Sequence, residues 1–290
     1  MSEILKQLNL SFADAVAAAG PSIVGVRSGR RIATGVAWGP GRVVTSTRAL
    51  SRRGVRVLTA DGEAHPATIL GYDAGTELAL LQVEGLDLPP LPHAEAPRVG
   101  ELVLVLGRPG EGVEATLGMV SAVGGPWRTG GGGVVDAFLE VDGRLPGGFS
   151  GGPLLSTGGG LIGVNTRGLR PGGATLPAET VARVVERLAT RGSPQRGYLG
   201  VGVQPVSLPE GPQPTGLIVT SVDPEGPAQA GGVLLGDVLL RLDGQGVGQL
   251  EDLWAWLGEA IGREVDLEVL RAGETVTLKV TPVARKRRCA

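Results

Sequence analysis

Residues 146–155 read PGGFSGGPLL, in which a serine lies among glycines just before a short apolar run. Glycine tolerates backbone conformations that other residues avoid, so a stretch of this composition can curl tightly. A curled loop here can point the N–H groups of Gly148 and Ser150 at one spot, which is what the stabilisation of an oxyanion requires. On this motif alone, an ordinary glycine-rich turn explains the stretch equally well.

Short apolar runs separated by Gly, Pro and Asp lie on both sides of this loop. Between residues 22 and 165 the runs are SIVGV, RVVTS, VRVLTA, ATILGY, ELALLQV, ELVLVLG, ATLGMVSAV, VVDAFLEV, GPLLS and LIGVNT. Their length and period are typical of β-strands. Many short strands divided by turns indicate a mainly β domain, built as a barrel or a sandwich.

Three segments have helical periodicity instead. We expect helices over residues 11–19, 178–191 and 249–261, each with apolar residues gathered on one face. Ser11 is a candidate cap for the first helix, which the following Gly-Pro pair ends. Gly192 is placed to end the second.

A second set of strands follows the segment SPQRG at 193–197, which has the composition of a hinge. Its strands are YLGVGVQPV, GLIVTSV, VDLEVLR and TVTLKVT, and the last two are joined by a turn at Ala272-Gly273. The chain is long enough for two domains with separate cores. We therefore expect one domain over residues 1–193 and another over 194–290.

Charge and composition narrow the classes of function. The net charge of −2 argues against a nucleic-acid partner, which calls for a basic surface. The basic run Arg285–Arg288 is interpreted as a solvated tail. No cluster of metal ligands and no phosphate-cradling loop is evident, so no metal and no cofactor is assigned. The single cysteine, Cys289, allows no internal disulfide.

Nowhere do eighteen apolar residues follow one another, so no membrane span is expected. The first twenty residues, MSEILKQLNLSFADAVAAAG, also lack the pattern of a secretory leader. As written, the chain is expected in the cytoplasm. If a leader has been removed, a periplasmic or extracellular location is expected instead.

Several segments, taken in order, carry a resemblance to a known family. They are PSIVGV at 21–26, GRVVTSTRAL at 41–50, GYDAGTELALLQVEG at 71–85, RVGELVLVLGRPG at 98–110, the serine loop, LIGVNTRG at 161–168 and RGYLGV at 196–201. Together they resemble the HtrA (Deg) family of trypsin-like serine proteases with a following PDZ domain. The resemblance implies a trypsin-like double β-barrel followed by a PDZ domain, itself a small β-barrel with capping helices. It also implies trimers formed through the N-terminal segment around Phe12.

The resemblance places the family's catalytic positions on this chain. The nucleophile falls on Ser150, and Asp142 also matches the family's pattern. The acid position holds Glu77 where the family has Asp, and the base position holds Arg48 where the family has His. Two of the three triad members therefore differ from the family.

Arginine cannot replace the histidine chemically. A base needs a lone pair to take the serine proton, whereas a guanidinium stays protonated and can only donate hydrogen bonds. Loss of the base costs on the order of a million-fold in turnover. Arg48 and Glu77 are instead expected to form an ion pair where the triad hydrogen bond would lie, the alternative being two independent surface charges.

Three other side chains of the first domain are candidates for a part in the site. His65 and His93 lie in segments away from the serine in the family's layout, and both are interpreted as surface histidines. Phe149 stands where the family usually has a polar residue. Its ring either fills the substrate cleft or rests against the rim of the barrel.

In the second domain, the loop Tyr198–Val201 resembles the carboxylate-binding loop of PDZ domains. The N–H groups of Leu199, Gly200 and Val201 are expected to hold a peptide's C-terminal carboxylate while the peptide adds a strand to the sheet. An apolar pocket is expected from Val201, Val203, Leu253 and Leu257, although these residues can equally be core. Trp254 and Trp256 are candidates for a docking surface.

Three hypotheses for function follow. The first is a pseudoprotease that binds unfolded or C-terminal peptide segments without efficient cleavage, in protein quality control or as a chaperone-like regulatory adaptor. The second is an active HtrA-type serine endopeptidase with a non-standard base. The third is a structural assembly unit whose PDZ domain mediates self-association. The identity of residue 48 separates the first two.

Overall fold

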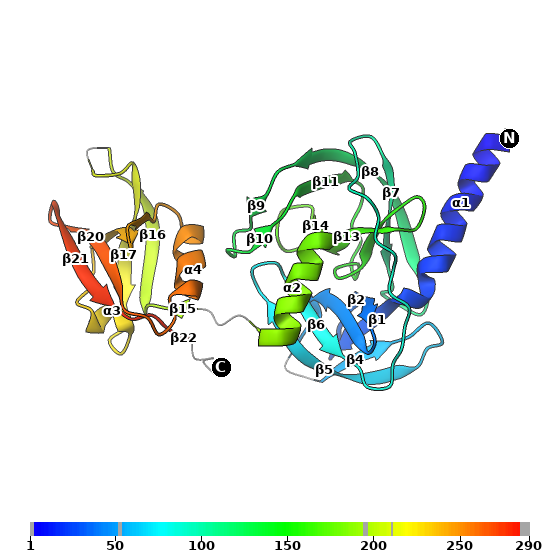
Figure 1. Cartoon of the computed structure of the whole chain (residues 1–290), viewed down its shortest axis with the longest axis horizontal. Coiled ribbons are helices and arrows are strands. Elements are labelled where there is room, and N and C mark those ends of the chain that lie inside the picture. Colours follow the sequence, from blue (N-terminus) through cyan, green and yellow to red (C-terminus); the bar gives the residue numbers. More distant parts are fainter. Residues whose placement is uncertain (1–2, 52–53, 194–196, 210, 285–290) are drawn as a thin grey trace. The chain divides into compact units, whose positions relative to one another are not determined.

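The structure is a computed structural model that describes residues 3–51, 54–193, 197–209 and 211–284. The chain forms two compact units, and most of the second unit follows Ser193 in the sequence (Figure 1). Both units are mainly β, as expected. The basic run Arg285–Arg288, Cys289 and the centre of the SPQRG segment lie outside the described residues.

Helix α1 (Glu3–Ala19) begins the first unit. It starts eight residues before the predicted residue 11, so the prediction that Ser11 caps the helix is wrong. The Ser11 hydroxyl instead donates to the carbonyl of Gln7 at 2.9 Å, which satisfies it within the helix. The end of the helix is confirmed, because a 3₁₀ turn (Gly20–Ser22) follows at once.

Six antiparallel strands then close the first barrel. In barrel order they are β1 (Ile23–Ser28), β2 (Arg31–Gly39), β3 (Arg42–Ser46), β6 (Leu78–Gln82), β5 (Ala64–Asp73) and β4 (Val55–Leu58). A short 3₁₀ turn, η2 (Thr47–Ala49), follows β3 and carries Arg48. Strand β2 was not among the predicted strands. A Cβ built on its Gly35 would lie 2.7 Å from a Val43 methyl, so glycine is required where the barrel interior is narrow.

The second part of this unit is a six-stranded antiparallel sheet. Its order is β11 (Phe138–Asp142), β8 (Glu114–Gly124), β7 (Leu102–Gly107), β12 (Pro153–Ser156), β13 (Leu161–Thr166) and β14 (Ala174–Pro177). A small hairpin, β9 (Trp127–Arg128) and β10 (Val134–Val135), connects β8 to β11. The serine loop lies between β11 and β12, so it is held from both ends by this sheet.

Helix α2 (Ala178–Arg191) packs on the first unit with a buried apolar face that includes Val181, Val184 and Leu188. Both bounds of this helix were predicted. Its C-cap is Gly192, at a φ of 68°, whose N–H donates to the carbonyl of Leu188. A left-handed residue at this point favours glycine.

The second unit is a small sheet with two helices. The sheet order is β16 (Val201–Ser207), β17 (Thr215–Val222), β18 (Val238–Leu242), β20 (Val265–Arg271) and β21 (Glu274–Val280), with β19 (Gln245–Gly246) paired to β18. Strand β15 (Gly197–Tyr198) pairs with β22 (Val283–Ala284). The helices are α3 (Pro227–Ala230) and α4 (Leu250–Glu259). The predicted turn at Ala272-Gly273 is confirmed, since both residues have positive φ, 50° and 90°.

Helix α4 is two residues shorter at its end than the predicted 249–261 and starts one residue later. Gln249 is its N-cap, and the Gln249 and Asp252 side chains form a capping box. Within the described residues, no helix has the length and apolar character needed to span a membrane.

Candidate functional site

The serine loop is clamped between β2 and β13. The carbonyl of Ser150 accepts the N–H of Thr34 at 3.1 Å, and the N–H of Gly151 donates to the carbonyl of Asn165 at 2.7 Å. Gly151 has a φ of 89°. A Cβ at this position would lie 2.1 Å from the Thr34 carbonyl oxygen, so only glycine fits. The position of the serine is thereby fixed by strands of both sheets.

Thr34 also orients the residues just before the serine. Its buried hydroxyl donates to the carbonyl of Gly148 at 2.8 Å and accepts the N–H of Arg108 at 2.9 Å. Sequence reasoning missed this residue, because Thr34 lies in the strand that was not predicted. Its contacts span 114 and 74 residues of chain, so no local pattern could have indicated them.

Arg108 ties this region to the start of the barrel. Its guanidinium donates to the carbonyls of Ile23, Glu111 and Gly20 at 2.7, 2.7 and 3.1 Å. Burial lowers the pKa of Arg108 below the ordinary value for arginine, because the charged form is partly removed from water. Among the described residues, its partners are these three carbonyl groups and no carboxylate.

The two donors expected for an oxyanion lie in this loop. Gly148 has a φ of 85°, a conformation that glycine adopts without strain. In the part of the chain that the structure describes, the N–H groups of Gly148 and Ser150 donate no hydrogen bond to another protein atom. Both therefore remain able to donate to a bound oxygen.

The Ser150 hydroxyl has one partner. The N–H of Arg167 donates to Ser150 Oγ at 3.3 Å. Among the described residues, no protein atom accepts the Ser150 hydroxyl proton, and no hydrogen bond joins Ser150 to Arg48 or to either histidine. Within the described residues, the Arg167 N–H is thus the one hydrogen-bond partner of Ser150 Oγ.

Arg48 and Glu77 form an ion pair through one nitrogen and one oxygen. Arg48 Nη1 is 3.8 Å from Glu77 Oε1, and the Arg48 side chain is 56 % exposed whereas that of Glu77 is 17 % exposed. The two-pronged arrangement that arginine and carboxylate can adopt is not formed. The other oxygen, Glu77 Oε2, accepts a 2.5 Å hydrogen bond from the hydroxyl of Thr166.

Glu77 itself is held in a constrained turn. Its φ is 57°, and its carbonyl accepts the N–H of Thr47 at 2.8 Å. A Cβ built on Gly168 would lie 2.0 Å from Glu77 Oε1, so the carboxylate rests directly on that glycine. Thr166 and Gly168 were missed by sequence reasoning, since both meet Glu77 across a long stretch of chain.

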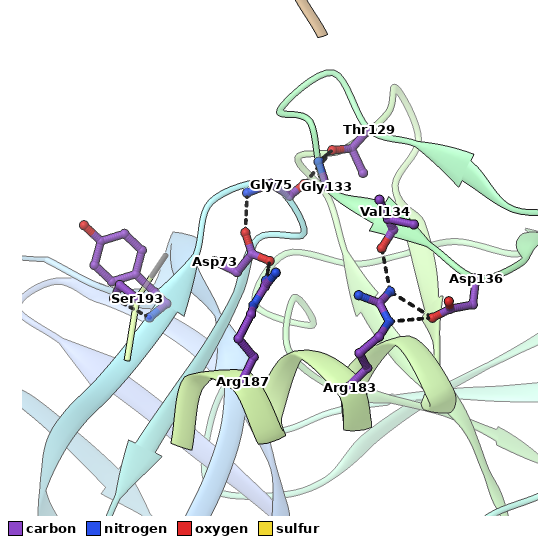
Figure 2. Close-up of polar contacts among 10 residues, drawn as sticks. Asp73, Gly75, Thr129, Gly133, Val134, Asp136, Arg183, Arg187 and Ser193 are labelled. Atoms are coloured by element: carbon purple, nitrogen blue, oxygen red, sulfur yellow. Dashed lines mark hydrogen bonds and ion pairs between the residues drawn. The ribbon is translucent and has the colours of Figure 1, made fainter. Parts of the chain in front are cut away.

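The turn that carries Glu77 is anchored on its outer side (Figure 2). Asp73 pairs with Arg187 of α2, and its other oxygen accepts the N–H of Gly75 at 2.9 Å. The hydroxyl of Thr129 donates to the carbonyl of Gly75 at 2.6 Å. Helix α2 and the β9–β10 hairpin thus both fix the acid position.

A second α2 arginine anchors the hairpin itself. Arg183 donates to Asp136 Oδ2 at 2.9 Å and to the carbonyl of Val134 at 2.9 Å (Figure 2). Burial would raise the pKa of Asp136, but hydrogen bonds from Thr180 and Arg183 and the charge of Arg183 outweigh it, and that pKa lies below its usual value.

Phe149 occupies neither of the two predicted places. Its side chain is fully buried in a cluster with Val105, Leu154 and other residues of the second sheet. A Cβ on Gly107 would lie 2.6 Å from the ring, so the ring packs flush on that glycine. The ring is therefore a core group, because an apolar side chain of this size gains most by full burial. It anchors the serine loop to the apolar core of the second sheet.

The two histidines lie in other contacts. His65 Nε2 is 3.7 Å from Glu63 Oε2 on the first barrel. The ring of His93 lies 5.8 Å from that of Trp38. Neither has a described contact with Ser150, Arg48 or Glu77.

The loop of the second unit has the geometry of a tight turn. Gly200 has a φ of 84°, and its carbonyl accepts the N–H of Asp223 at 2.7 Å. The hydroxyl of Tyr198 donates to Asp223 Oδ2 at 2.5 Å, and the buried Leu199 anchors the loop in the core. These contacts leave the loop fixed at the start of β16.

The residues expected to form a peptide pocket belong to one cluster. Leu253 and Leu257 are buried, at 3 % and 5 % exposed, and Val201 and Val203 pack against the same group. Trp256 is also part of that core, so it is not a docking surface, whereas Trp254 is 47 % exposed.

Comparison with known proteins agrees with this architecture. The trypsin-like peptidase domain family matches residues 33–164, and the PDZ domain family matches residues 197–281. A solved HtrA-type protease, AlgW with a decapeptide, is 25 % identical, with a TM-score of 0.72 over 95 % of this chain and 99 % of that one. The serine endoprotease from Yersinia pestis is 27 % identical, with a TM-score of 0.73 over 95 % of this chain and 98 % of that one.

The chain belongs to the HtrA family. Both domains occur in the family's order, and the solved HtrA-type structures match nearly the whole chain. Sequence relatives named probable periplasmic serine endoprotease DegP-like agree. That of Halomonas elongata is 35 % identical over 76 % of this chain and 49 % of its own length. That of Bartonella henselae is 33 % identical over 83 % of this chain and 50 % of its own length.

The chain therefore spans about half the length of the curated HtrA relatives that it matches. Those relatives carry the name of a protease. What this HtrA chain does depends on the residues of its own site.

Proposed function

We propose that this chain is an HtrA-like pseudoprotease: it binds unfolded or C-terminal peptide segments and does not cut them efficiently. The observation that carries the proposal is the environment of Ser150. Its hydroxyl has no described acceptor, and the side chain at the base position is the guanidinium of Arg48.

The chemistry at this site supports retention of binding without turnover. Attack by serine requires that its proton leaves as the new bond forms, and an arginine has no lone pair with which to take it. The donors of Gly148 and Ser150 remain, so a peptide carbonyl can still be bound there. A site with an oxyanion hole and no base retains only background catalysis.

Peptide capture is assigned to the second unit. Two solved relatives are described as HtrA-type proteases with a decapeptide or a tripeptide. In this chain the loop Tyr198–Val201 leads into β16, an edge strand of its sheet. An added peptide strand on β16 would bring its C-terminus to the N–H groups of Leu199, Gly200 and Val201.

The test uses the purified chain with unfolded casein and with a fluorophosphonate probe, which labels only a nucleophilic serine. We expect no casein fragments above the level of Ser150→Ala, and no labelling of Ser150. An active HtrA-type protease from a relative serves as the positive control. Ser150-dependent digestion of casein would show that the proposal is wrong.

An active endopeptidase is the second candidate, and one observation favours it. The serine loop keeps its glycines and its clamps to β2 and β13, which a chain under no demand for catalysis need not preserve. A base would then have to come from outside the described residues. The same probe experiment decides between the two.

The names of the relatives support a proposal for the cellular location of this chain and for its binding partners. Proteins called periplasmic match most of this chain, so we propose the periplasm, rather than the cytoplasm, as its place of action. Its partners there would be unfolded proteins and peptide C-termini, in protein quality control. Self-association through the PDZ domain, as a structural assembly unit, would not require the tight turn of the Tyr198–Val201 loop.

A further inference from the structure

Two exposed arginine side chains border the serine loop. Arg167 follows β13, and its own N–H reaches Ser150 Oγ, while its Nη1 would lie 3.9 Å from a Cβ built on Gly147. Arg48 follows β3, and the N–H of nearby Ser46 would lie 2.8 Å from a Cβ on Gly151. Both guanidinium groups are therefore attached to segments that touch the loop.

The local charges do not balance. Among the described residues no carboxylate lies within 4.0 Å of the Arg167 guanidinium. Glu77 meets Arg48 only at 3.8 Å, and its other oxygen is committed to Thr166. Arg170, three residues after Arg167, already forms an ion pair: its Nη2 lies 3.9 Å from Glu140 Oε1.

The remaining charges near the loop cancel one another. Asp142 and Arg144 are both exposed in the segment that leads into the loop, one of each sign. Arg48 and Arg167, counted with the Glu77 carboxylate, therefore leave one surplus positive charge beside the loop. The N–H groups of Gly148 and Ser150 belong to the same loop and also favour a negatively charged oxygen.

We infer that the site over Ser150 binds an acidic stretch of peptide, with Asp or Glu carboxylates held by Arg48 and Arg167. This rests on the proposed function, because an acidic segment can stay bound only if it is not cut. Arginine suits the role, since its planar fork can take both oxygens of a carboxylate. Arg48 is 56 % exposed, so it can turn from Glu77 toward a ligand.

The test measures fluorescence anisotropy of the full chain with three labelled peptides. They share one unstructured sequence with Glu, Gln or Lys at the same four positions, and all are amidated at the C-terminus so that the PDZ loop cannot capture them. We expect the Glu peptide to bind about tenfold more tightly than the Gln peptide at low salt. Added NaCl should shrink that difference, because exposed charges are screened.

The variants assign the effect to the two arginines. Arg48→Gln together with Arg167→Gln should remove the preference for the Glu peptide, and Arg167→Glu should shift the preference toward the Lys peptide. The matched control is Arg42→Gln, which removes one exposed positive charge at the other end of β3 and should leave the preference unchanged. Circular dichroism melts check that each variant is folded.

Two results would overturn the inference: equal binding of the Glu and Gln peptides, or a preference that survives in the double variant. If a peptide with a free C-terminus is still bound intact, the proposed function stands and only the acidic preference fails. If the wild-type chain cuts any of these peptides, the proposed function itself fails.

Discussion

The side chain of Arg48 is longer than a histidine and carries a permanent charge. A small rotation cannot therefore rebuild the chain of hydrogen bonds from acid to base to nucleophile. Glu77 has two side-chain partners: Thr166 donates to one oxygen at 2.5 Å, and Arg48 lies 3.8 Å from the other. Restoring a triad would therefore require changes at both residue 48 and residue 77.

A paired reversal should restore turnover. We expect Arg48→His with Glu77→Asp to raise casein hydrolysis at least about a hundredfold above wild type, since a base would again face Ser150. Arg48→His alone should gain less, because Glu77 is one methylene too long. Residue 77 has a φ of 57°, which Asp adopts more readily than Glu.

Fragment release from labelled casein measures the gain. Adding Ser150→Ala to the double variant should abolish it, which excludes a contaminating protease. A folded double variant with no activity would mean that the geometry of the serine loop, and not the missing base, limits this site.

At single positions, the sequence alone identified candidate site residues where the signal is local. Examples are Ser150 with its neighbouring glycines, and the arginine at residue 48. The hydroxyls of Thr34 and Thr166 are not, because their partners lie 114 and 89 residues away. Their roles follow from strand pairing, which no short pattern encodes.

At the scale of elements, predictability followed the clarity of the apolar pattern. Helix α2 has one apolar face and a terminal glycine, so both of its ends were predicted. Helix α1 was predicted too short, although Ile4, Leu8 and Phe12 already recur at the four-residue spacing of one helix face. Strand β2 was missed because Gly35 interrupts its apolar run.

In the second unit, a buried aspartate just before β18 binds the last residue of β20. Asp237 is 2 % exposed, accepts two 2.8 Å hydrogen bonds from Arg271 of β20, and accepts the N–H of Leu234 at 2.8 Å. Burial would raise the pKa of Asp237, but the hydrogen bonds from Arg271 and Leu234 and the charge of Arg271 outweigh it, so that pKa is lowered.

The sign of this shift predicts a pH dependence. A carboxyl with a depressed pKa in the folded state stabilises the fold above its unfolded pKa of about 3.9, and loses that contribution as the pH falls through the folded pKa. We expect Asp237→Asn to be less stable than wild type at pH 7. The two should converge as the pH falls below about 4.

Hydrogen exchange of the segment 233–242, measured by mass spectrometry in the full chain, reports the local stability around Asp237 at each pH. The control is Asp266→Asn on the same sheet, whose side chain is 56 % exposed and which should change little. Parallel pH profiles for wild type and Asp237→Asn would contradict the assignment.

At the scale of the whole molecule, helix α1 leaves apolar side chains uncovered. Ile4, Leu5, Leu8 and Leu10 are 75 %, 55 %, 42 % and 50 % exposed. Phe12, where the family resemblance places the trimer contact, packs partly against the core of its own barrel. The surface that remains for another copy is therefore the part of α1 before Phe12.

An exposed apolar row of this kind marks an interaction site, and symmetric self-association is the common way to cover it. We expect light scattering of the full chain to give about three times the chain mass of 29.5 kDa. Leu5→Glu with Leu8→Glu should lower the mass to that of one chain, because the charges would be buried in the contact. Gln7→Glu adds a charge to the same helix as the control and should leave the oligomer intact. A wild-type chain that stays monomeric at tens of micromolar would show that α1 has another use, because mass action at that concentration populates any contact of ordinary strength.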